Sequence, residues 1–161
     1  MPKCVYIGLG SNLDDPVAQL KRGFVALDSL PASCCMRRSS LYRSAPLGPA
    51  GQPDYINAVA ELETALSAQE LLAQLQAIEA HHGRVRGGER WAARVLDLDI
   101  LLYADVRMHD AVLTIPHAEM LAREFVLYPL FEIAPALEIP GAGNLKQWVE
   151  RCPARGLERI E

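Results

Sequence analysis

The chain has 161 residues, of which 50% are hydrophobic and 22% charged, and its formal net charge at pH 7 is −4. These proportions are typical of a soluble globular domain and exclude disordered, collagen-like and mucin-like chains. The longest apolar runs, such as residues 126–131, are far shorter than the roughly 20 residues that a membrane-spanning helix needs. The first residues also lack the apolar segment of a signal peptide, so we expect one cytosolic domain over residues 1–161.

The net charge and the cysteines restrict the kinds of binding site that this chain is expected to have. Sixteen Lys and Arg stand against twenty Asp and Glu, so the surface as a whole does not attract polyanions and any anion site has to be local. Cys4, Cys34, Cys35 and Cys152 show neither C-x-x-C pairing nor zinc-ligand spacing, and we expect four reduced thiols. A small acidic domain of this kind favours a monomer that binds neither nucleic acid nor membranes.

The first half of the chain is predicted to form three strands and one helix. A short strand over residues 5–9 ends at a turn-like triplet, residues 10–12. Asp15-Pro16 then begins a helix, with Asp as N-cap and Pro at the first helical position, and the helix stops before Pro31. A strand over residues 35–44 leads into a Pro/Gly-rich loop, after which a third strand spans residues 55–64.

The second half is predicted to contain three more helices around one strand. Ser67 and Glu70 form a capping box for a helix that ends near residue 83. An arginine-rich loop, residues 84–94, precedes the clearest strand, residues 96–103. Residues 120–133 are mostly helical, and Asn144 caps a short last helix. The order β-α-β-β-α-β predicts an α+β sandwich of ferredoxin-like type with an antiparallel central sheet.

Two carboxylates in the strand at residues 96–103 are the strongest functional signal. Because side chains alternate along a strand, Asp97 and Asp99 point to one face while Leu98, Ile100 and Leu102 point to the other and fill the core. Two acids side by side repel each other, and Mg²⁺, which binds one or two carboxylates together with phosphate oxygens, would satisfy both. The alternative is an edge strand with two solvated acids.

Four arginines lie just before this strand. Arg84, Arg86, Arg90 and Arg94 stand within eleven residues, with Glu89 as the one acid among them. Arginine forks bind phosphate in a bidentate manner, so this loop predicts a phosphate site next to a metal site, as a nucleotide phosphotransferase requires. A solvated basic loop is the other interpretation.

A third feature follows the Pro/Gly-rich loop. Tyr55 and Asn57 share one face of a strand, and this pairing of a flat ring with a donor–acceptor amide suits a planar heterocycle with polar edges. A core tyrosine beside a turn asparagine would give the same pattern. The chain has no G-x-x-x-x-G-K-[S/T] motif, and the Gly8-x-Gly10 segment lacks the third glycine of a dinucleotide-binding fingerprint, so we interpret it as a turn.

Together these segments resemble the 6-hydroxymethyl-7,8-dihydropterin pyrophosphokinase family of folate biosynthesis, over about residues 4–135. The matching segments are GLGSNL at 8–13, SLYRSAPLG at 40–48, QPDYIN at 52–57, GRVR at 83–86, RWAARVLDLD at 90–99, Pro116-His117 and REFVLYPL at 123–130. The resemblance implies transfer of pyrophosphate from ATP to the pterin hydroxymethyl group, with AMP as the other product.

The resemblance also implies residue roles. Asp97 and Asp99 match ligands of two Mg²⁺ ions, and the catalytic set comprises Asp97, Asp99, Arg84 and Arg94. The implied pterin-binding residues are Ser44, Ala45, Leu47, Tyr55, Asn57, Trp91, Asp97 and Phe125. The implied ATP-binding residues are Gln76, Glu79, Arg84, Arg86, Trp91, Arg94, Ile100, Thr114, His117 and Arg123. Loops 45–54 and 84–94 are expected to be mobile and to close over the two substrates.

This chain departs from the family's pattern at a few positions. Ala93 replaces a common proline, Val112 an arginine and Ala118 an aromatic residue, and we expect weaker nucleotide contacts at the last two. Two other classes of function remain open. One is a non-catalytic pterin or nucleotide carrier, which would not need the acid pair, and the other is an RNA-binding module, which the acidic pI disfavours.

Overall fold

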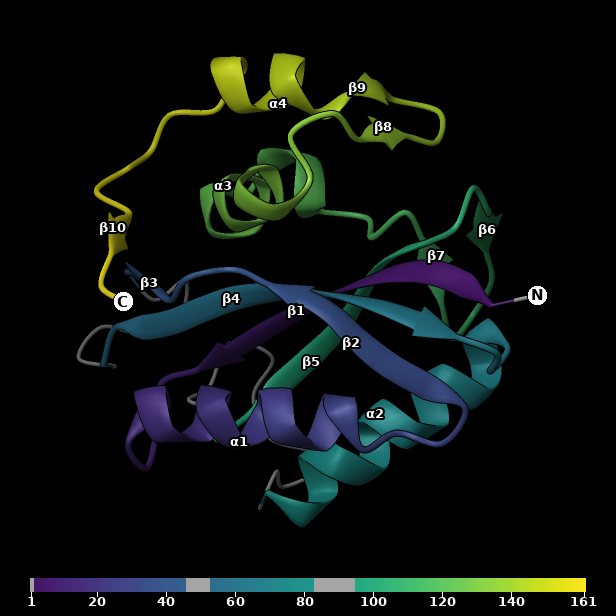
Figure 1. Ribbon diagram of the computed structural model, residues 1–161. Coiled ribbons are helices and arrows are strands. Elements are labelled where there is room, and N and C mark those ends of the chain that lie inside the picture. Colours follow the sequence, from purple (N-terminus) through teal and green to yellow (C-terminus); the bar gives the residue numbers. More distant parts are fainter. Residues whose placement is uncertain (1, 46–52, 83–94) are drawn as a thin grey trace.

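The computed structural model describes residues 2–45, 53–82 and 95–161. In that part of the chain, six strands form one sheet. In spatial order they are β10 (Glu158–Arg159), β3 (Tyr42–Ser44), β4 (Tyr55–Thr64), β1 (Lys3–Ser11) and β5 (Asp97–Tyr103), and β2 (Ser33–Arg38) also pairs with β4. Two layers of helices enclose this sheet, α1 (Pro16–Asp28) and α2 (Ala68–His81) on one face and α3 (Glu124–Ile133) and α4 (Leu145–Arg151) on the other (Figure 1). Among the described residues, every strand pairing within this sheet is antiparallel, which confirms the α+β prediction.

β1 (Lys3–Ser11) is a central strand of the sheet. It lies between β4 (Tyr55–Thr64) and β5 (Asp97–Tyr103), so its backbone is hydrogen-bonded on both sides. The predicted turn at residues 10–12 is therefore wrong, because Gly10 pairs with Asn57 on one side and with Asp97 on the other. A glycine inside a strand allows another group to approach the backbone closely, which proves important for the site.

Local signals at the helix starts are confirmed. Asp15 caps α1 by accepting from the backbone N–H of Ala18, and Ser67 and Glu70 form the capping box of α2. Asn144 caps α4 by accepting from the N–H of Lys146. Each of these caps satisfies a backbone donor that has no partner within its helix.

The predicted strand over residues 35–44 is two strands, β2 (Ser33–Arg38) and β3 (Tyr42–Ser44). Both pair with β4, but the chain leaves the ladder between them. Between them, Ser39 still donates its N–H to the carbonyl of Val59 on β4, whereas the N–H of Ser40 donates to the carboxylate of Glu132 on α3 at 3.0 Å. The helix predicted over 120–133 is likewise divided, into a 3₁₀ turn, η1 (Met120–Ala122), and α3.

Two hydrophobic clusters lie on the two faces of the sheet. One packs β1, β4 and β5 against α1 and α2, and the other packs the opposite face against α3 and α4. Leu98 and Ile100 belong to the first cluster as predicted, but Leu102 belongs to the second. The prediction for Leu102 is wrong because a β-bulge shifts the register, so that Tyr6 pairs with Leu102 and Ile7 with Ile100.

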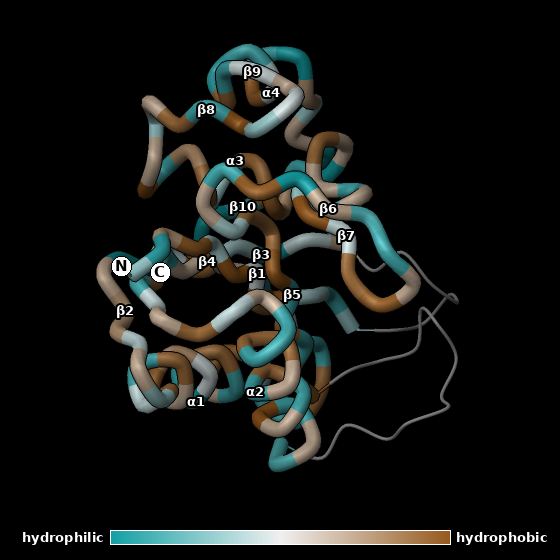
Figure 2. The backbone as a smooth tube through the Cα atoms, turned by 90° about the vertical axis from the view of Figure 1, so that its right-hand side faces the viewer, coloured by the Kyte–Doolittle hydropathy of each residue, from teal (hydrophilic) through white to brown (hydrophobic). Residues whose placement is uncertain are grey.

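Shorter strands complete the chain. β6 (Met108–His109) and β7 (Thr114–Ile115) form a hairpin after β5, and β8 (Glu138–Ile139) pairs with β9 (Gly143–Asn144) before α4. The C-terminal strand β10 (Glu158–Arg159) returns to the sheet and pairs with β3. Figure 2, turned by 90°, shows the sheet between the layer of α1 and α2 and the layer of α3 and α4. In the described residues, no helix is both long and apolar enough to cross a membrane.

Candidate active site

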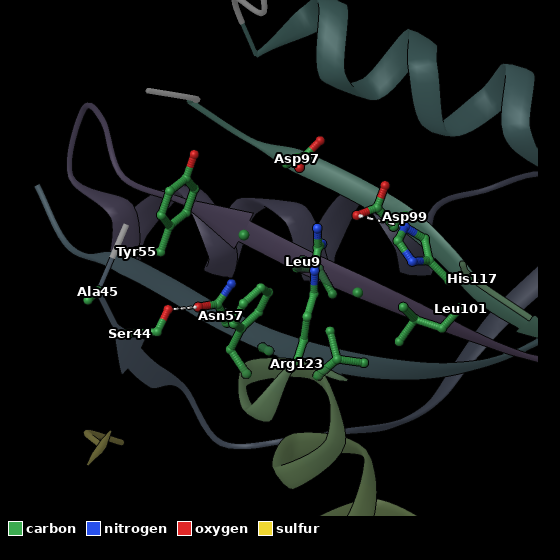
Figure 3. A pocket seen from close by; sticks show the side chains of 15 residues that line it. Leu9, Ser44, Ala45, Tyr55, Asn57, Asp97, Asp99, Leu101, His117 and Arg123 are labelled. Atoms are coloured by element: carbon green, nitrogen blue, oxygen red, sulfur yellow. Dashed lines mark hydrogen bonds and ion pairs between the residues drawn. The ribbon is translucent and has the colours of Figure 1, made fainter. Parts of the chain in front are cut away.

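A pocket of about 820 Å³, open solvent included, lies on the α3 side of the sheet near one end of β1. Figure 3 shows two walls, with carboxylates along β5 on one side and the polar and aromatic side chains of β3 and β4 on the other. The lining residues are Gly8, Leu9, Gly10, Ser44, Ala45, Tyr55, Asn57, Ala58, Asp97, Asp99, Leu101, His117, Arg123, Phe125 and Val126.

The first wall is formed by the two aspartates of β5. Asp97 and Asp99 both line the pocket, which confirms that they share a face of the strand, and 43% of the Asp99 side chain is exposed. Leu98 between them is 4% exposed and points into the opposite core. The carboxylates therefore stay partly hydrated while the residue between them anchors the strand.

A buried glutamate on α2 holds this part of β5 from the other side of the sheet. Glu79 is 5% exposed, and its Oε2 atom accepts a hydrogen bond from the backbone N–H of Leu98 at 2.8 Å. The bond joins α2 to the peptide between the two pocket aspartates. Glu79 thus fixes the backbone that presents Asp97 and Asp99.

His117 extends the carboxylate wall. Its Nε2 atom lies 4.0 Å from Oδ2 of Asp99, and its Nδ1 atom accepts from the N–H of Glu119 at 3.2 Å. Burial lowers the pKa of His117, and the charge of Arg123 lowers it further, against the opposing effects of Glu119 and Asp97. Both observations indicate a neutral ring with its proton on Nε2, facing Asp99 and the pocket.

The second wall presents an amide beside an aromatic ring. Ser44 Oγ donates to Oδ1 of the buried Asn57 at 2.7 Å, which leaves the Nδ2 atom turned toward the pocket (Figure 3). Tyr55, two residues earlier on β4, lies on the same wall. Gly10 forms the floor beside them, since a Cβ there would lie 3.1 Å from Asn57 Nδ2 and 3.8 Å from Cδ1 of Tyr55. This wall suits a flat ligand with hydrogen-bonding edges.

The start of α3 closes the pocket with a cation and a second aromatic ring. Arg123 forms an ion pair with Glu119, and its guanidinium carbon lies 5.5 Å from the centroid of the Phe125 ring. Only 17% of the Arg123 side chain is exposed. A partly desolvated arginine over an aromatic ring is a strong site for a phosphate or another anion.

Comparisons with known proteins agree with this geometry. Residues 6–135 match the family model described as 7,8-dihydro-6-hydroxymethylpterin-pyrophosphokinase (HPPK). The chain belongs to this family. A relative from Pseudomonas aeruginosa, named 2-amino-4-hydroxy-6-hydroxymethyldihydropteridine pyrophosphokinase, is 46% identical over 97% of this chain and 96% of its own length. One of the same name from Haemophilus influenzae is 50% identical over 91% of each chain.

Solved structures show the same fold. The wild-type HPPK-DHPS of Plasmodium falciparum with pteroate superposes with a TM-score of 0.74, covering 94% of this chain. This chain spans 42% of that longer one, and the sequence identity is 12%. The resemblance inferred from the sequence motifs is therefore confirmed for the family and for the fold.

Most of the HPPK site residues predicted on the described segments lie together. The pocket brings together Ser44, Ala45, Tyr55, Asn57, Asp97, Asp99, His117, Arg123 and Phe125. Gln76, Glu79, Ile100 and Thr114 do not line it: Gln76 is exposed on α2, Ile100 is 3% exposed in the core, and Thr114 contacts His109. The remaining predicted site residues lie outside the described residues, as do most of the loops predicted to close. These site residues are Leu47, Arg84, Arg86, Trp91 and Arg94.

Sequence reasoning missed part of the lining. Gly8, Leu9, Gly10, Ala58, Leu101 and Val126 also line the pocket. The two glycines carried a usable signal, because glycine within an apolar strand marks a place where a ligand or another chain approaches the backbone. The apolar residues carried none, since their pattern is that of any core strand or helix.

Proposed function

We propose that this chain carries out the reaction for which its family is named. It transfers pyrophosphate from ATP to the hydroxymethyl group of 6-hydroxymethyl-7,8-dihydropterin in folate biosynthesis, and AMP leaves. The observation that carries this proposal is one pocket in which paired carboxylates face an amide, two aromatic rings and an arginine. An acidic wall that holds a metal and a polar, aromatic wall that holds a heterocycle are the two halves such a reaction needs.

The pterin binds at the wall formed by β3, β4 and α3. Tyr55 and Phe125 supply faces for the ring, and Asn57, with its Nδ2 atom directed into the pocket, donates to a ring edge. Ser44 fixes the orientation of that amide through the 2.7 Å hydrogen bond to Oδ1. Ala45, Leu47 and Trp91 are proposed as further pterin contacts on the strength of the family motif.

Mg²⁺ is the proposed cofactor, as two ions held by Asp97 and Asp99. The residues fit it, since both are oxygen ligands directed into the pocket, and Mg²⁺ uses one or two carboxylates with substrate phosphates completing its shell. Among residues 2–45, 53–82 and 95–161, no group of three or more His, Cys, Asp or Glu forms a self-sufficient metal site. When bound, the ions would neutralise phosphate charge.

ATP phosphates are proposed to bind between β5 and α3. Arg123 offers a cation to them, and the neutral His117 offers its Nε2–H as a donor beside Asp99. Most of the catalysis then comes from positioning the pterin hydroxyl in line with the β-phosphorus and from stabilising charge, with no covalent enzyme intermediate. The proposal includes two catalytic cations, Arg84 and Arg94. It also includes further ATP contacts, which are Gln76, Glu79, Arg86, Trp91, Ile100 and Thr114.

The test is product analysis by chromatography, with ATP and Mg²⁺ in the presence and absence of 6-hydroxymethyl-7,8-dihydropterin. We expect AMP and a pterin diphosphate only when both substrates are present. ADP would indicate transfer of the γ-phosphate instead, and pterin binding without turnover would indicate a carrier. Either result would overturn the proposal.

Substitution of the pocket acids tests the metal assignment. We expect Asp97→Asn to reduce turnover by at least about a thousandfold, because charge stabilisation at transferring phosphates dominates such reactions. Asp105→Asn is the matched control, since Asp105 is exposed just after β5 and does not line the pocket. Near-normal activity of the Asp97 variant with Mg²⁺ present would refute the role of the acid pair.

We also propose a single-domain, cytosolic monomer over residues 1–161 that binds neither nucleic acid nor membranes. The net charge of −4 supports the part of this proposal that concerns nucleic acid and anionic membranes, because the net charge repels a polyanion. Light scattering after size-exclusion chromatography tests the monomer, and gel retardation at low salt tests for nucleic-acid binding.

A further inference from the structure

The C-terminal segment, residues 152–161, descends from α4 to β10 (Figure 1). Tyr128 OH of α3 donates to the backbone carbonyl of Cys152 at 2.6 Å, and β10 pairs with β3, whose last residue is Ser44. The segment therefore contacts both the helix and the strand that form the proposed pterin wall.

Within this segment, Arg155 contacts the residues on both sides of Arg123. Its Nη1 atom donates to the carbonyl oxygen of Ala122 at 3.2 Å and to Oε1 of Glu124 at 3.3 Å. Arg123 lies between these two partners and points into the pocket. One guanidinium thus holds the peptide that carries a pocket cation.

Glu124 relays this contact to a second pocket residue. Its side chain is 11% exposed, and while Oε1 accepts from Arg155, Oε2 accepts from the backbone N–H of Phe125 at 3.1 Å. That N–H lies in the first turn of α3, where the helix itself supplies no acceptor. The positions of Arg123 and Phe125 therefore both depend on a carboxylate and a carbonyl that Arg155 holds in place.

We propose that Arg155 is a positioning residue for the pterin wall, acting through Ala122 and Glu124 to fix Arg123 and Phe125. It lies beyond residues 6–135, the part that matches the family model, and it does not line the pocket. The proposal rests on the proposed function of that pocket.

The test compares Arg155→Ala, Arg155→Lys and the control Arg151→Ala, which removes an exposed arginine from the last turn of α4. Arg155 has a positive φ of 49°, and both replacements keep a Cβ there, so backbone strain is the same in all forms. Its side chain is 55% exposed, so truncation leaves no buried cavity, but it removes the cation from the Glu124 carboxylate, which is 11% exposed. The folded fraction of each variant is therefore measured at the assay temperature, and the affinity is corrected for it.

Calorimetric titration with 6-hydroxymethyl-7,8-dihydropterin, with and without a non-hydrolysable ATP analogue, gives the first readout. We expect Arg155→Ala to weaken pterin binding by about five- to twentyfold. This is less than the roughly 10- to 150-fold equivalent of a lost charged hydrogen bond, because Arg155 acts through Ala122 and Glu124 and not on the ligand itself. Arg155→Lys keeps a cationic donor and should restore most of the affinity, whereas Arg151→Ala should match the wild type. Wild-type affinity of the alanine variant, or a loss fully explained by a smaller folded fraction, overturns the proposal.

Hydrogen exchange of the Phe125 amide gives a second readout that needs no ligand. We expect faster exchange in Arg155→Ala than in the wild type and near-wild-type exchange in Arg155→Lys. If the wild type neither binds nor converts the pterin, the proposed function fails, and this exchange still decides whether Arg155 orders the start of α3. Unchanged protection in the alanine variant refutes that ordering.

Discussion

Removal of the Glu79 carboxylate should loosen the strand that carries the acid pair. Glu79 is buried on α2, and its carboxylate accepts a hydrogen bond of 2.8 Å from the N–H of Leu98 on β5. This bond joins the helix to the strand that it covers. Leu98 lies between Asp97 and Asp99, so this backbone sets the separation and direction of both carboxylates. We therefore expect Glu79→Ala to impair both stability and metal-dependent turnover.

The size of the effect follows from the group that is left behind. Glu79→Ala removes the acceptor of a buried backbone N–H, and an unsatisfied donor of this kind costs about 1–3 kcal/mol. For a chain of this length each kcal/mol lowers the melting temperature by roughly 2–4 °C. Glu79→Gln keeps a carbonyl oxygen at the same place, so we expect it to lose clearly less stability than the alanine variant.

Thermal melts and turnover as a function of Mg²⁺ concentration provide the assay. The alanine variant should need a higher Mg²⁺ concentration for half-maximal rate, and the Leu98 amide should exchange faster with solvent. Gln69→Ala is the control, because Gln69 is exposed on the same helix. ATP binding measured without Mg²⁺ separates this role from the predicted ATP contact. A Glu79→Ala protein with wild-type melting and wild-type Mg²⁺ dependence would refute the reasoning.

Two further predictions concern the pocket floor and its histidine. Gly10→Ala places a methyl group 3.1 Å from Asn57 Nδ2 and should weaken pterin binding about tenfold in calorimetry, whereas Gly8→Ala, whose Cβ meets the flexible Leu101 side chain at 3.4 Å, should bind nearly as the wild type. Equal affinities of the two variants would contradict this. His117 has a pKa below its ordinary value of 6.5, so below that pH the unfolded chain binds a proton that the folded protein resists, and stability falls as the pH is lowered. Denaturant unfolding of His117→Asn from about pH 7 to about pH 5 should therefore show a shallower decline, and an equally steep one would refute the assignment.

Local signals predicted the helix starts and the long strands. Asp15, Ser67 and Asn144 each cap a helix through a backbone donor within three residues, so the sequence alone contains the whole interaction. The period of two along β5 placed Asp97 and Asp99 on one face in the same way. These features need no information from distant parts of the chain.

Features that depend on distant partners were not predictable from one sequence. At the break between β2 and β3, the N–H of Ser40 donates to Glu132, which is 92 residues away and forms no local pattern with it. The side of the sheet on which Leu102 lies is set by a bulge in the pairing of β5 with β1. β10 has only two residues and gains its structure from β3, so nothing in its own composition marks it as a strand.

The distinction between local patterns and contacts with distant residues also applies within the candidate active site. Motif reasoning finds side chains that face the substrate, because their chemistry is unusual where the sequence is otherwise apolar, as with Asp97 and Asn57. It does not show which residues hold the backbone behind them: Glu79 was expected only as an ATP contact, and Arg155 was not singled out. Glu79 acts across 19 positions and Arg155 across 31, so neither forms a local pattern with its partner. Such positioning roles become visible only when the fold brings the elements together. The loss of Arg155 should therefore alter pterin affinity without removing any group that touches a substrate, and the loss of the Glu79 carboxylate should alter metal dependence through the backbone of Leu98.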